Sequence, residues 1–309
     1  LVQTGETYLR RSLPTETPGE FPVLDELAER NLTDYIALIH RFGADGAIGE
    51  MDCIYSSWVT DVDAGFSKES LRGMKVLIPS LAVAMKCASL ARITQTLVET
   101  YLGRNTGRRV LAGHIARGVA DTISAVLWFS DLRGFTRITE TTEPSSVIPF
   151  LNDYSDAVIS SIHEAGGEVL KLIGDGTLAI FDGSDPARGC RMALAAEKAL
   201  RKRLPDLSRD HAERGLPVTT AYIGLHIGEV FYGNVGSEDR LDFTVVGPAV
   251  NEASRVAAMC RSAERDVLMS AAFRAAASEE DRSRLVSVGR YALRGVTQPQ
   301  ELFTLDTSA

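Results

Sequence analysis

The chain has 309 residues, of which 45% are hydrophobic and 24% are charged, an ordinary composition for a soluble globular protein. Its net charge of −8 at pH 7 argues against a general affinity for nucleic acid or for an anionic membrane surface. The four cysteines are far apart and form no metal-ligand spacing, which indicates reduced thiols and a cytoplasmic location. The longest apolar run, residues 76–84, is too short to cross a bilayer, so no membrane span is expected.

Residues 1–80 predict a small α+β region. Two strands are expected at 34–42 and 51–59, and a long helix begins at the Ser of GFS, which is a suitable N-cap. This order of two strands, a WVTD turn and a capped helix resembles the C-terminal half of a GAF-like sensor domain. Trp58, Tyr55 and Phe66 either line a pocket for an unknown small-molecule effector or form the core of this region.

A connecting helix and linker are predicted over residues 81–120. Leu90, Ile93, Leu97 and Tyr101 recur every three or four residues and form a narrow apolar stripe. Such a stripe suits the seam of a parallel dimer, and it equally suits a helix that packs on its own domain. The sequence leaves both interpretations open.

The rest of the chain is organised around residues 126–182, which hold two carboxylates at the ends of apolar, strand-like runs. Asp131 follows the run 126–129, and Asp175 lies in a Gly-Asp-Gly turn that reads as the tip of a hairpin. Gly134 and the start of a helix come next after Asp131, where backbone N–H groups favour an anion such as phosphate. Mg²⁺ prefers one or two carboxylates with phosphate oxygens and water, so the pattern indicates a metal–nucleotide site or two ordinary turn aspartates.

Strand and helix patterns alternate from residue 121 to the C-terminus. The predicted helices cover residues 145–164, 185–203, 249–259 and 271–279. The predicted later strands cover residues 218–227, 241–246, 267–270, 286–293 and 302–305. This alternation predicts an α+β fold with one mixed sheet and its helices on one side.

Four motifs identify the family that this part of the chain resembles. FSDLRGFT, KLIGDG, GEVFYGNVGSEDRLDFTVVG and PAVNEASR occur in the order and at about the spacing of class III nucleotidyl cyclase catalytic domains. The resemblance assigns residues 121–309 to such a domain and implies its ferredoxin-like, palm-type fold, with a mixed and mostly antiparallel sheet. It implies an enzyme in which the ribose 3′-hydroxyl of a nucleoside triphosphate attacks the α-phosphorus in line, so that pyrophosphate leaves.

The resemblance also implies which residues meet the metal and the triphosphate. Asp131, Asp175 and the Leu132 carbonyl match the positions that hold two metal ions per site, Mg²⁺ or Mn²⁺. The triphosphate is expected against the backbone that follows Asp131 and against one basic residue near the C-terminus. These substrate-binding residues are Gly134, Phe135, Thr136 and Arg294.

Asn251 and Arg255 lie four residues apart on one predicted helix and therefore share a face. In the family the matching Asn orients the ribose, and the matching Arg stabilises charge on the α-phosphate in the transition state. A guanidinium fork suits that charge better than an ammonium group does.

Lys171 and Thr244 match the two positions that read the base. Lysine can donate to adenine N1, which is an acceptor, whereas guanine N1–H is a donor and calls for a carboxylate. Many adenine-selective members have Asp at the second position. This chain has Thr244 there, as a bacterial-type subgroup does, so ATP is the expected substrate, with weaker discrimination against GTP. Asp242 lies two residues earlier, and its spacing to Gly247 argues against a base-reading role.

In the family the metal-binding aspartates come from one protomer, and the base-reading pair, the Asn and the Arg come from the other. This chain carries both sets, which implies a head-to-tail homodimer with two shared sites. The leading prediction is a cytoplasmic adenylate cyclase that makes cyclic AMP in signal transduction. The alternatives are a guanylate cyclase, a catalytically silent nucleotide-binding module of the same fold, and a diguanylate cyclase, which the IGDG turn argues against.

Overall fold

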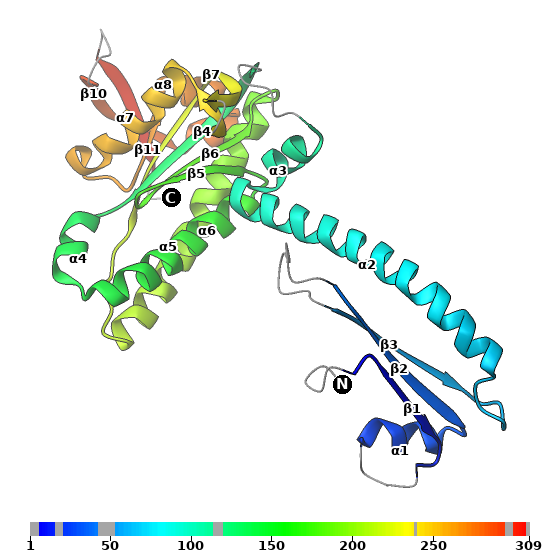
Figure 1. Cartoon of the computed structure of the whole chain (residues 1–309). Coiled ribbons are helices and arrows are strands. Elements are labelled where there is room, and N and C mark those ends of the chain that lie inside the picture. Colours follow the sequence, from blue (N-terminus) through cyan, green and yellow to red (C-terminus); the bar gives the residue numbers. More distant parts are fainter. Residues whose placement is uncertain are drawn as a thin grey trace. The chain divides into compact units, whose positions relative to one another are not determined.

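The computed structural model describes residues 6–15, 21–42, 53–113, 120–237, 240–293 and 299–306 (Figure 1). The predicted turn between the first two strands and the predicted phosphate ligand Arg294 lie outside these residues. The chain forms two compact units, Leu1–Val98 and Glu99–Ala309, and the division falls within one long helix.

The first unit is a three-stranded antiparallel sheet with two helices. Its elements are β1 (Tyr8–Ser12), α1 (Pro22–Glu29), β2 (Asp34–Arg41), β3 (Cys53–Thr60) and α2 (Lys68–Leu102), whose last four residues belong to the second unit. The strand order is β1-β2-β3. Tyr35 and Ala37 of the central strand pack with Leu24 of α1, while Ile36, of opposite parity, lies across from Trp58 on the other face.

A buried ion pair fixes the start of α2 to this sheet. Asp34 is 1% exposed and accepts from the Arg10 guanidinium, with Nη2–Oδ2 at 2.6 Å, and from the Phe66 backbone N–H at 2.9 Å. Gly65 has a φ of +67°, and a side chain there would collide with the Asp34 carboxylate. The GFS motif therefore supplies both the turn and the anchor from which the helix begins.

Helix α2 is longer and more exposed than the apolar run 76–84 indicated. The helix is 35 residues long and includes Pro79. By length and composition alone, it is long and apolar enough to cross a membrane. Only 11% of its most apolar window is buried. One such helix is weak evidence for a membrane span, and the expectation that the chain has none stays untested.

The second unit contains an eight-stranded sheet and the remaining helices. Its helices are α3 (Arg104–Leu111), α4 (Phe135–Thr141), α5 (Pro144–Glu164), α6 (Pro186–Glu213), α7 (Pro248–Ala263), α8 (Ala271–Ala276) and α9 (Glu279–Ser283). Its strands are β4 (Ala120–Leu132), β5 (Glu168–Ile173), β6 (Gly176–Asp182), β7 (Ala221–Gly236), β8 (Leu241–Val246), β9 (Val267–Ser270), β10 (Leu285–Tyr291) and β11 (Gln300–Leu305).

The sheet is mixed and mostly antiparallel, as the sequence predicted. The strand order is β10-β11-β9-β7-β4-β6-β5, with β8 paired to β7 outside this path. Only the β7–β9 pair is parallel among the described strands. The central strand β4 follows alternating parity, with Val126 and Trp128 on one face and Ala125 and Leu127 on the other.

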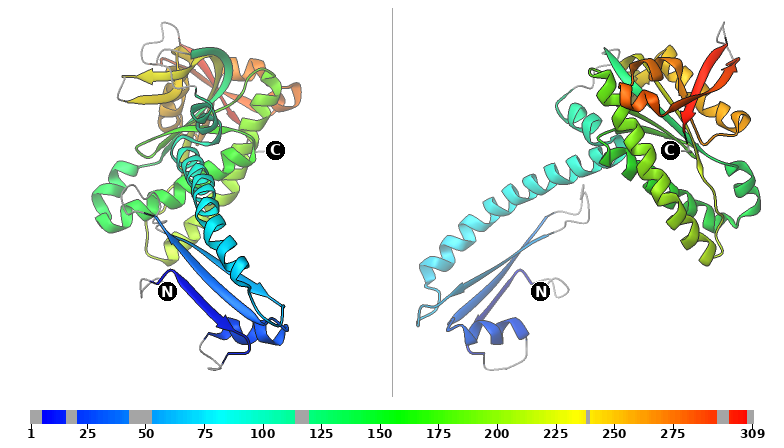
Figure 2. Two further views of the ribbon diagram at one scale, coloured as in Figure 1. Left: turned by 45° about the vertical axis from the view of Figure 1, so that its right-hand side comes forward. Right: turned by 180° about the vertical axis from the view of Figure 1, so that it is seen from behind.

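The prediction that the helices lie on one side of the sheet was wrong. Figure 2 shows α5 and α6 along one face of the sheet. Apolar residues of both helices belong to the same buried cluster as Trp128. The other face is covered by α7, through Ala253, and by residues of β7 and β8 that pack with Leu127. Both parities of β4 are apolar, so both faces of the strand need cover from water.

The second half of β7 and strand β8 form a hairpin that we call the β7–β8 arm, residues 228–246. Tyr232 and Phe243 meet in it edge to face, with ring centroids 4.7 Å apart. The Tyr232 hydroxyl donates to Glu168 of β5, and the Arg109 guanidinium of α3 lies 5.0 Å from the Tyr232 ring centroid. The arm is thereby held between the sheet and the helix that precedes the sheet.

Candidate functional site

Two strand ends bring the predicted metal-binding aspartates to one edge of the sheet. Asp131 lies at the end of β4, and Asp175 lies at the tip of the β5–β6 hairpin, which pairs with β4 so that Ser130 is opposite Thr177. Gly174 has a φ of +63°, and a Cβ at Gly176 would lie 3.0 Å from the Ser130 carbonyl oxygen. The Gly-Asp-Gly sequence thus allows the tight turn and its close approach to β4.

The two carboxylates converge on one backbone N–H group. Leu132 N donates to Asp131 Oδ1 at 3.1 Å and to Asp175 Oδ2 at 3.2 Å. Partial removal from water and the hydrogen-bonding Asp175 carboxylate raise the pKa of Asp131 to about 7. A divalent cation fits this site, because its charge would offset the cost of an ionised Asp131 beside a second carboxylate.

The metal ligands available within the described residues are few. No group of three or more His, Cys, Asp or Glu residues gathers there in a way that could hold an ion. Two carboxylates without a further side-chain ligand suit Mg²⁺ or Mn²⁺, which take their remaining ligands from backbone carbonyls, water and phosphate oxygens. The residue set fits an ion shared with a substrate better than a closed structural site.

The predicted phosphate segment follows directly. Gly134 has a φ of +73° and open space around its Cβ position, and it precedes the first turn of α4. Arg133 anchors the segment, since its N–H donates to the Thr220 carbonyl at 2.8 Å and its carbonyl accepts from Thr219 Oγ1 at 2.6 Å. The Phe135 ring stacks on Phe150 of α5 and packs against the core, so its side chain anchors α4. Thr136 is exposed.

The predicted base-reading positions lie on β5 and β8. Lys171 of β5 forms an ion pair with Asp242 of β8, the residue whose spacing argued against a role. Phe243 and Val245 are buried, so Asp242 and Thr244 share the opposite face of β8. No hydrogen bond of the Thr244 side chain is found in the described part of the chain. The alternation of side chains along β8 predicts that Asp242 lies on the same face as Thr244. The contact of Asp242 with Lys171 of β5 could not be predicted from residue spacing.

Asn251 and Arg255 share the outer side of α7. The helix begins with Pro248 at its first position and buries Ala249, Ala253 and Val256 against the sheet. In the chain as described, no ion pair or hydrogen bond connects Asn251 or Arg255 with Asp131 or Asp175. The aspartates lie at the end of β4 and at the tip of the β5–β6 hairpin, and the predicted base-reading and catalytic residues lie on β5, β8 and α7.

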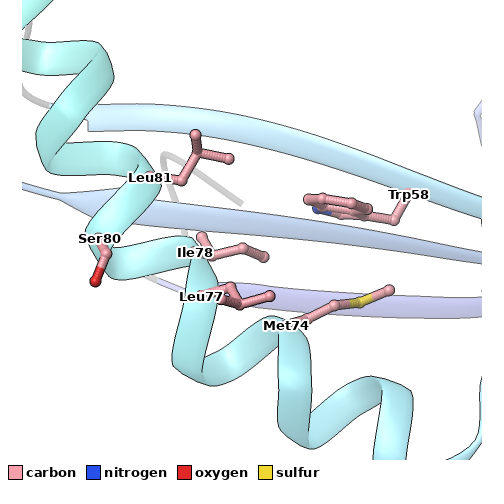
Figure 3. A pocket seen from close by; sticks show the side chains of 6 residues that line it. All are labelled: Trp58, Met74, Leu77, Ile78, Ser80 and Leu81. Atoms are coloured by element: carbon pink, nitrogen blue, oxygen red, sulfur yellow. The ribbon is translucent and has the colours of Figure 1, made fainter.

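The first unit contains a separate apolar cavity of about 510 Å³. Figure 3 shows the side chains of β3 and α2 that line it: Trp58, Met74, Leu77, Ile78, Ser80 and Leu81. Of the three residues expected to form either a pocket or the core of this region, Trp58 lines this cavity, and Tyr55 and Phe66 do not. The Tyr55 hydroxyl pairs with that of Tyr35, on the face of the sheet opposite Trp58.

Comparison with known proteins agrees with this geometry. Residues 119–307 match the family model described as the adenylate and guanylate cyclase catalytic domain. An adenylate cyclase of Anabaena cylindrica is 36% identical over 156 residues, which are 50% of this chain and 31% of that protein. An uncharacterized protein of Mycobacterium tuberculosis is 35% identical over 212 residues, 66% of this chain and 37% of that protein. The chain thus spans about a third of the length of these curated relatives.

Solved structures share the fold. The adenylyl cyclase CyaB from P. aeruginosa superimposes with a TM-score of 0.56 at 24% identity, over 62% of this chain and 97% of that one. A bacterial light-regulated adenylyl cyclase superimposes with a TM-score of 0.63 at 23% identity, over 74% of this chain and 65% of that one. With the family model matched over more than half of its length, this chain belongs to the class III adenylate and guanylate cyclase family.

Proposed function

We propose that the chain is an adenylate cyclase that converts ATP to 3′,5′-cyclic AMP and pyrophosphate in signal transduction. The observation that carries the proposal is the convergence of Asp131 and Asp175 on the Leu132 N–H at the end of β4. This convergence supports a site for two divalent ions, Mg²⁺ or Mn²⁺, with the Leu132 carbonyl as a further ligand. Such ions would lower the pKa of the ribose 3′-hydroxyl and neutralise triphosphate oxygens.

The surrounding residues bind and orient the nucleotide. Backbone N–H groups of Gly134, Phe135 and Thr136 would receive phosphate oxygens at the start of α4, and Arg294 is proposed as their basic partner. These contacts would hold the triphosphate so that the α-phosphorus lies in line between the 3′-hydroxyl and the leaving pyrophosphate.

Asn251 and Arg255 are proposed as the catalytic side chains, with Asn251 holding the ribose and Arg255 stabilising charge that develops on the α-phosphate. Arg255 suits this role because, in the described part of the chain, its guanidinium has no carboxylate or carbonyl partner. Lys171 and Thr244 are proposed to read adenine, as in the Lys/Thr bacterial-type subgroup, with Lys171 donating to N1 and Thr244 accepting from the 6-amino group.

The working form is proposed to be a head-to-tail homodimer with two shared sites. Among the described residues, Asn251 and Arg255 make no hydrogen bond or ion pair with either aspartate, which supports this assembly. The exposed side of α2 supports a second, parallel contact between the copies. Val76, Val83, Leu90 and Leu97 recur every seven residues on that side, and three of them are at least 46% exposed. We call this row the α2 seam.

The first unit is proposed as a GAF-like regulatory region, with residues 81–120 as its connection to the catalytic domain. The apolar cavity beside Trp58 supports a small-molecule effector of apolar character. The catalytic domain is proposed to work in the cytoplasm, where its substrate ATP is made.

A product assay tests the function. Purified protein would receive ATP or GTP separately, with Mg²⁺ or Mn²⁺, over a series of protein concentrations. Cyclic AMP with a specific activity that rises with concentration is the expected result. Cyclic GMP alone would make the chain a guanylate cyclase and overturn the base assignment. No product from the chain or from residues 116–309 would favour a silent nucleotide-binding module.

A further inference from the structure

The ion pair between Lys171 and Asp242 links two strands that are not neighbours in the sheet. Lys171 lies on β5 at one sheet edge, and Asp242 lies on β8, which pairs with β7. Their side chains are 43% and 44% exposed, so both remain accessible to a ligand. An exposed ion pair contributes little to the free energy of folding. A contribution to stability is therefore a weak explanation for the contact between these two charges.

The strands on either side of this pair are anchored. Glu168, three residues before Lys171, accepts from the Tyr232 hydroxyl at 3.3 Å, which ties β5 to the β7–β8 arm. Phe243, next to Asp242, packs edge to face on the same Tyr232 ring. Asp242 is therefore presented from a fixed backbone, whereas the four-carbon stem of Lys171 is free to move. The carboxylate thus limits where the ammonium group can go.

The two purine bases require that ammonium group at different places. Adenine offers an acceptor at N1 and a donor at its 6-amino group, whereas guanine offers an acceptor at O6 and a donor at N1–H. A mobile lysine can follow the acceptor from N1 to O6 and accept either base. Thr244 resists neither base, because a hydroxyl both donates and accepts.

We propose that Asp242 is the positioning residue that gives this site its preference for adenine. Its ion pair would hold the Lys171 ammonium group where it can donate to adenine N1. Its carboxylate, on the same strand face as Thr244, would repel O6 of guanine, which is also an acceptor. The inference rests on the proposed nucleotide cyclase function and adds a determinant of base choice to it.

The test is the Asp242→Asn variant, compared with wild type for kcat/KM on ATP, GTP and ITP. Hypoxanthine has the O6 and N1–H of guanine without its 2-amino group, so ITP isolates the edge that Lys171 reads. The ratio of kcat/KM for ATP to that for GTP should fall about tenfold. The ratio of kcat/KM for ATP to that for ITP should fall by a similar factor. Asp242→Glu should retain part of the preference.

Two controls separate positioning from a structural effect. Glu229→Gln removes one exposed carboxylate from the same arm and should leave the ratio unchanged. In a Lys171→Gln background, Asp242→Asn should no longer change the ratio, because the residue acts through Lys171. Equal losses on ATP and GTP, or an unchanged ratio in Asp242→Asn, would overturn the proposal.

A binding measurement distinguishes this proposal from the proposed function. Affinities for 3′-deoxy-ATP and 3′-deoxy-GTP with Mn²⁺ report base preference without turnover. If wild type makes no cyclic nucleotide but prefers 3′-deoxy-ATP in a manner that Asp242→Asn removes, the cyclase function fails and the role of Asp242 stands. Equal binding of the two analogues by wild type, or no binding of either, would refute the role of Asp242.

Discussion

Replacing Asp175 by Asn should make the metal-free protein more stable at pH 8, although it removes a site residue. The pKa of Asp131 is raised from 3.8 to about 7 by partial burial and by Asp175. Between these values the native state binds more protons than the unfolded state, so the free energy of unfolding falls as the pH rises. Above pH 7 the Asp131 carboxylate is ionised beside Asp175, and the full cost of its position is present.

The magnitude follows from that shift. Three pKa units correspond to about 4 kcal/mol, but partial burial, which Asp175→Asn leaves in place, is the largest cause of the shift. Because Asp131 is also partly exposed, screening by solvent reduces the part that is due to Asp175 to about 1–2 kcal/mol. At about 2–4 °C per kcal/mol for a unit of this size, the melting temperature of Asp175→Asn should rise by about 2–8 °C at pH 8. The increase should vanish at pH 4.

Differential scanning calorimetry with EDTA, from pH 4 to pH 8, measures this effect. Mn²⁺ should raise the melting temperature of wild type more at pH 8 than at pH 6, because the ion replaces a proton, and should have little effect on Asp175→Asn. Asp206→Asn, on the exposed side of α6, serves as the charge-matched control. Two results together would refute the reasoning. They are a wild-type melting temperature that stays constant or rises from pH 4 to pH 8 without metal, and a melting temperature of Asp175→Asn that is no higher than that of wild type at pH 8.

The remaining expectations concern assembly and coupling. Asp175→Asn and Arg255→Ala should each be nearly inactive, but an equal mixture should regain about a quarter of wild-type activity, since half of randomly paired dimers have one intact site. No recovery after subunit exchange would argue against shared sites. Cys87, exposed on the same side of α2 as the α2 seam, should cross-link two copies under mild oxidation, and intact dimers that yield no cross-link would exclude the parallel contact. Glu168→Gln should weaken ATP binding severalfold and have a smaller effect on kcat. A substrate titration measures both constants, and an unchanged KM would argue against Glu168 as an anchor of β5.

The sequence predicted most of the catalytic fold because its patterns are local. A Gly-Asp-Gly turn between two apolar runs predicts a hairpin wherever it occurs, and the hairpin places Asp175 at its tip beside the end of β4. Pro248 after a glycine predicts the start of α7, and a spacing of four places Asn251 and Arg255 on one side of it.

Contacts between distant elements could not be predicted in the same way. The helices were expected on one side of the sheet, but Leu127 requires cover that α7 and the β7–β8 arm provide. The contact of Lys171 with Asp242 depends on how the arm crosses the sheet, and no periodicity in either strand encodes that crossing. Alternation along β8 does predict that Asp242 and Thr244 share one face of that strand, as the structure shows.

The anchor at Glu168 links the base-reading residues to the helix that enters the catalytic unit. Its carboxylate accepts from Asn105 Nδ2 at 3.1 Å and Thr106 Oγ1 at 3.4 Å, both on α3, and from the Tyr232 hydroxyl of the β7–β8 arm. A shift of α3 that breaks the first two contacts leaves Glu168 with fewer donors and loosens β5 three residues before Lys171. Because Tyr232 also supports the strand that carries Asp242, such a shift would disturb both members of the ion pair at once. In the proposed site, base recognition and the entry of α3 would therefore depend on one carboxylate, and a signal at α3 would have a short physical route to substrate affinity.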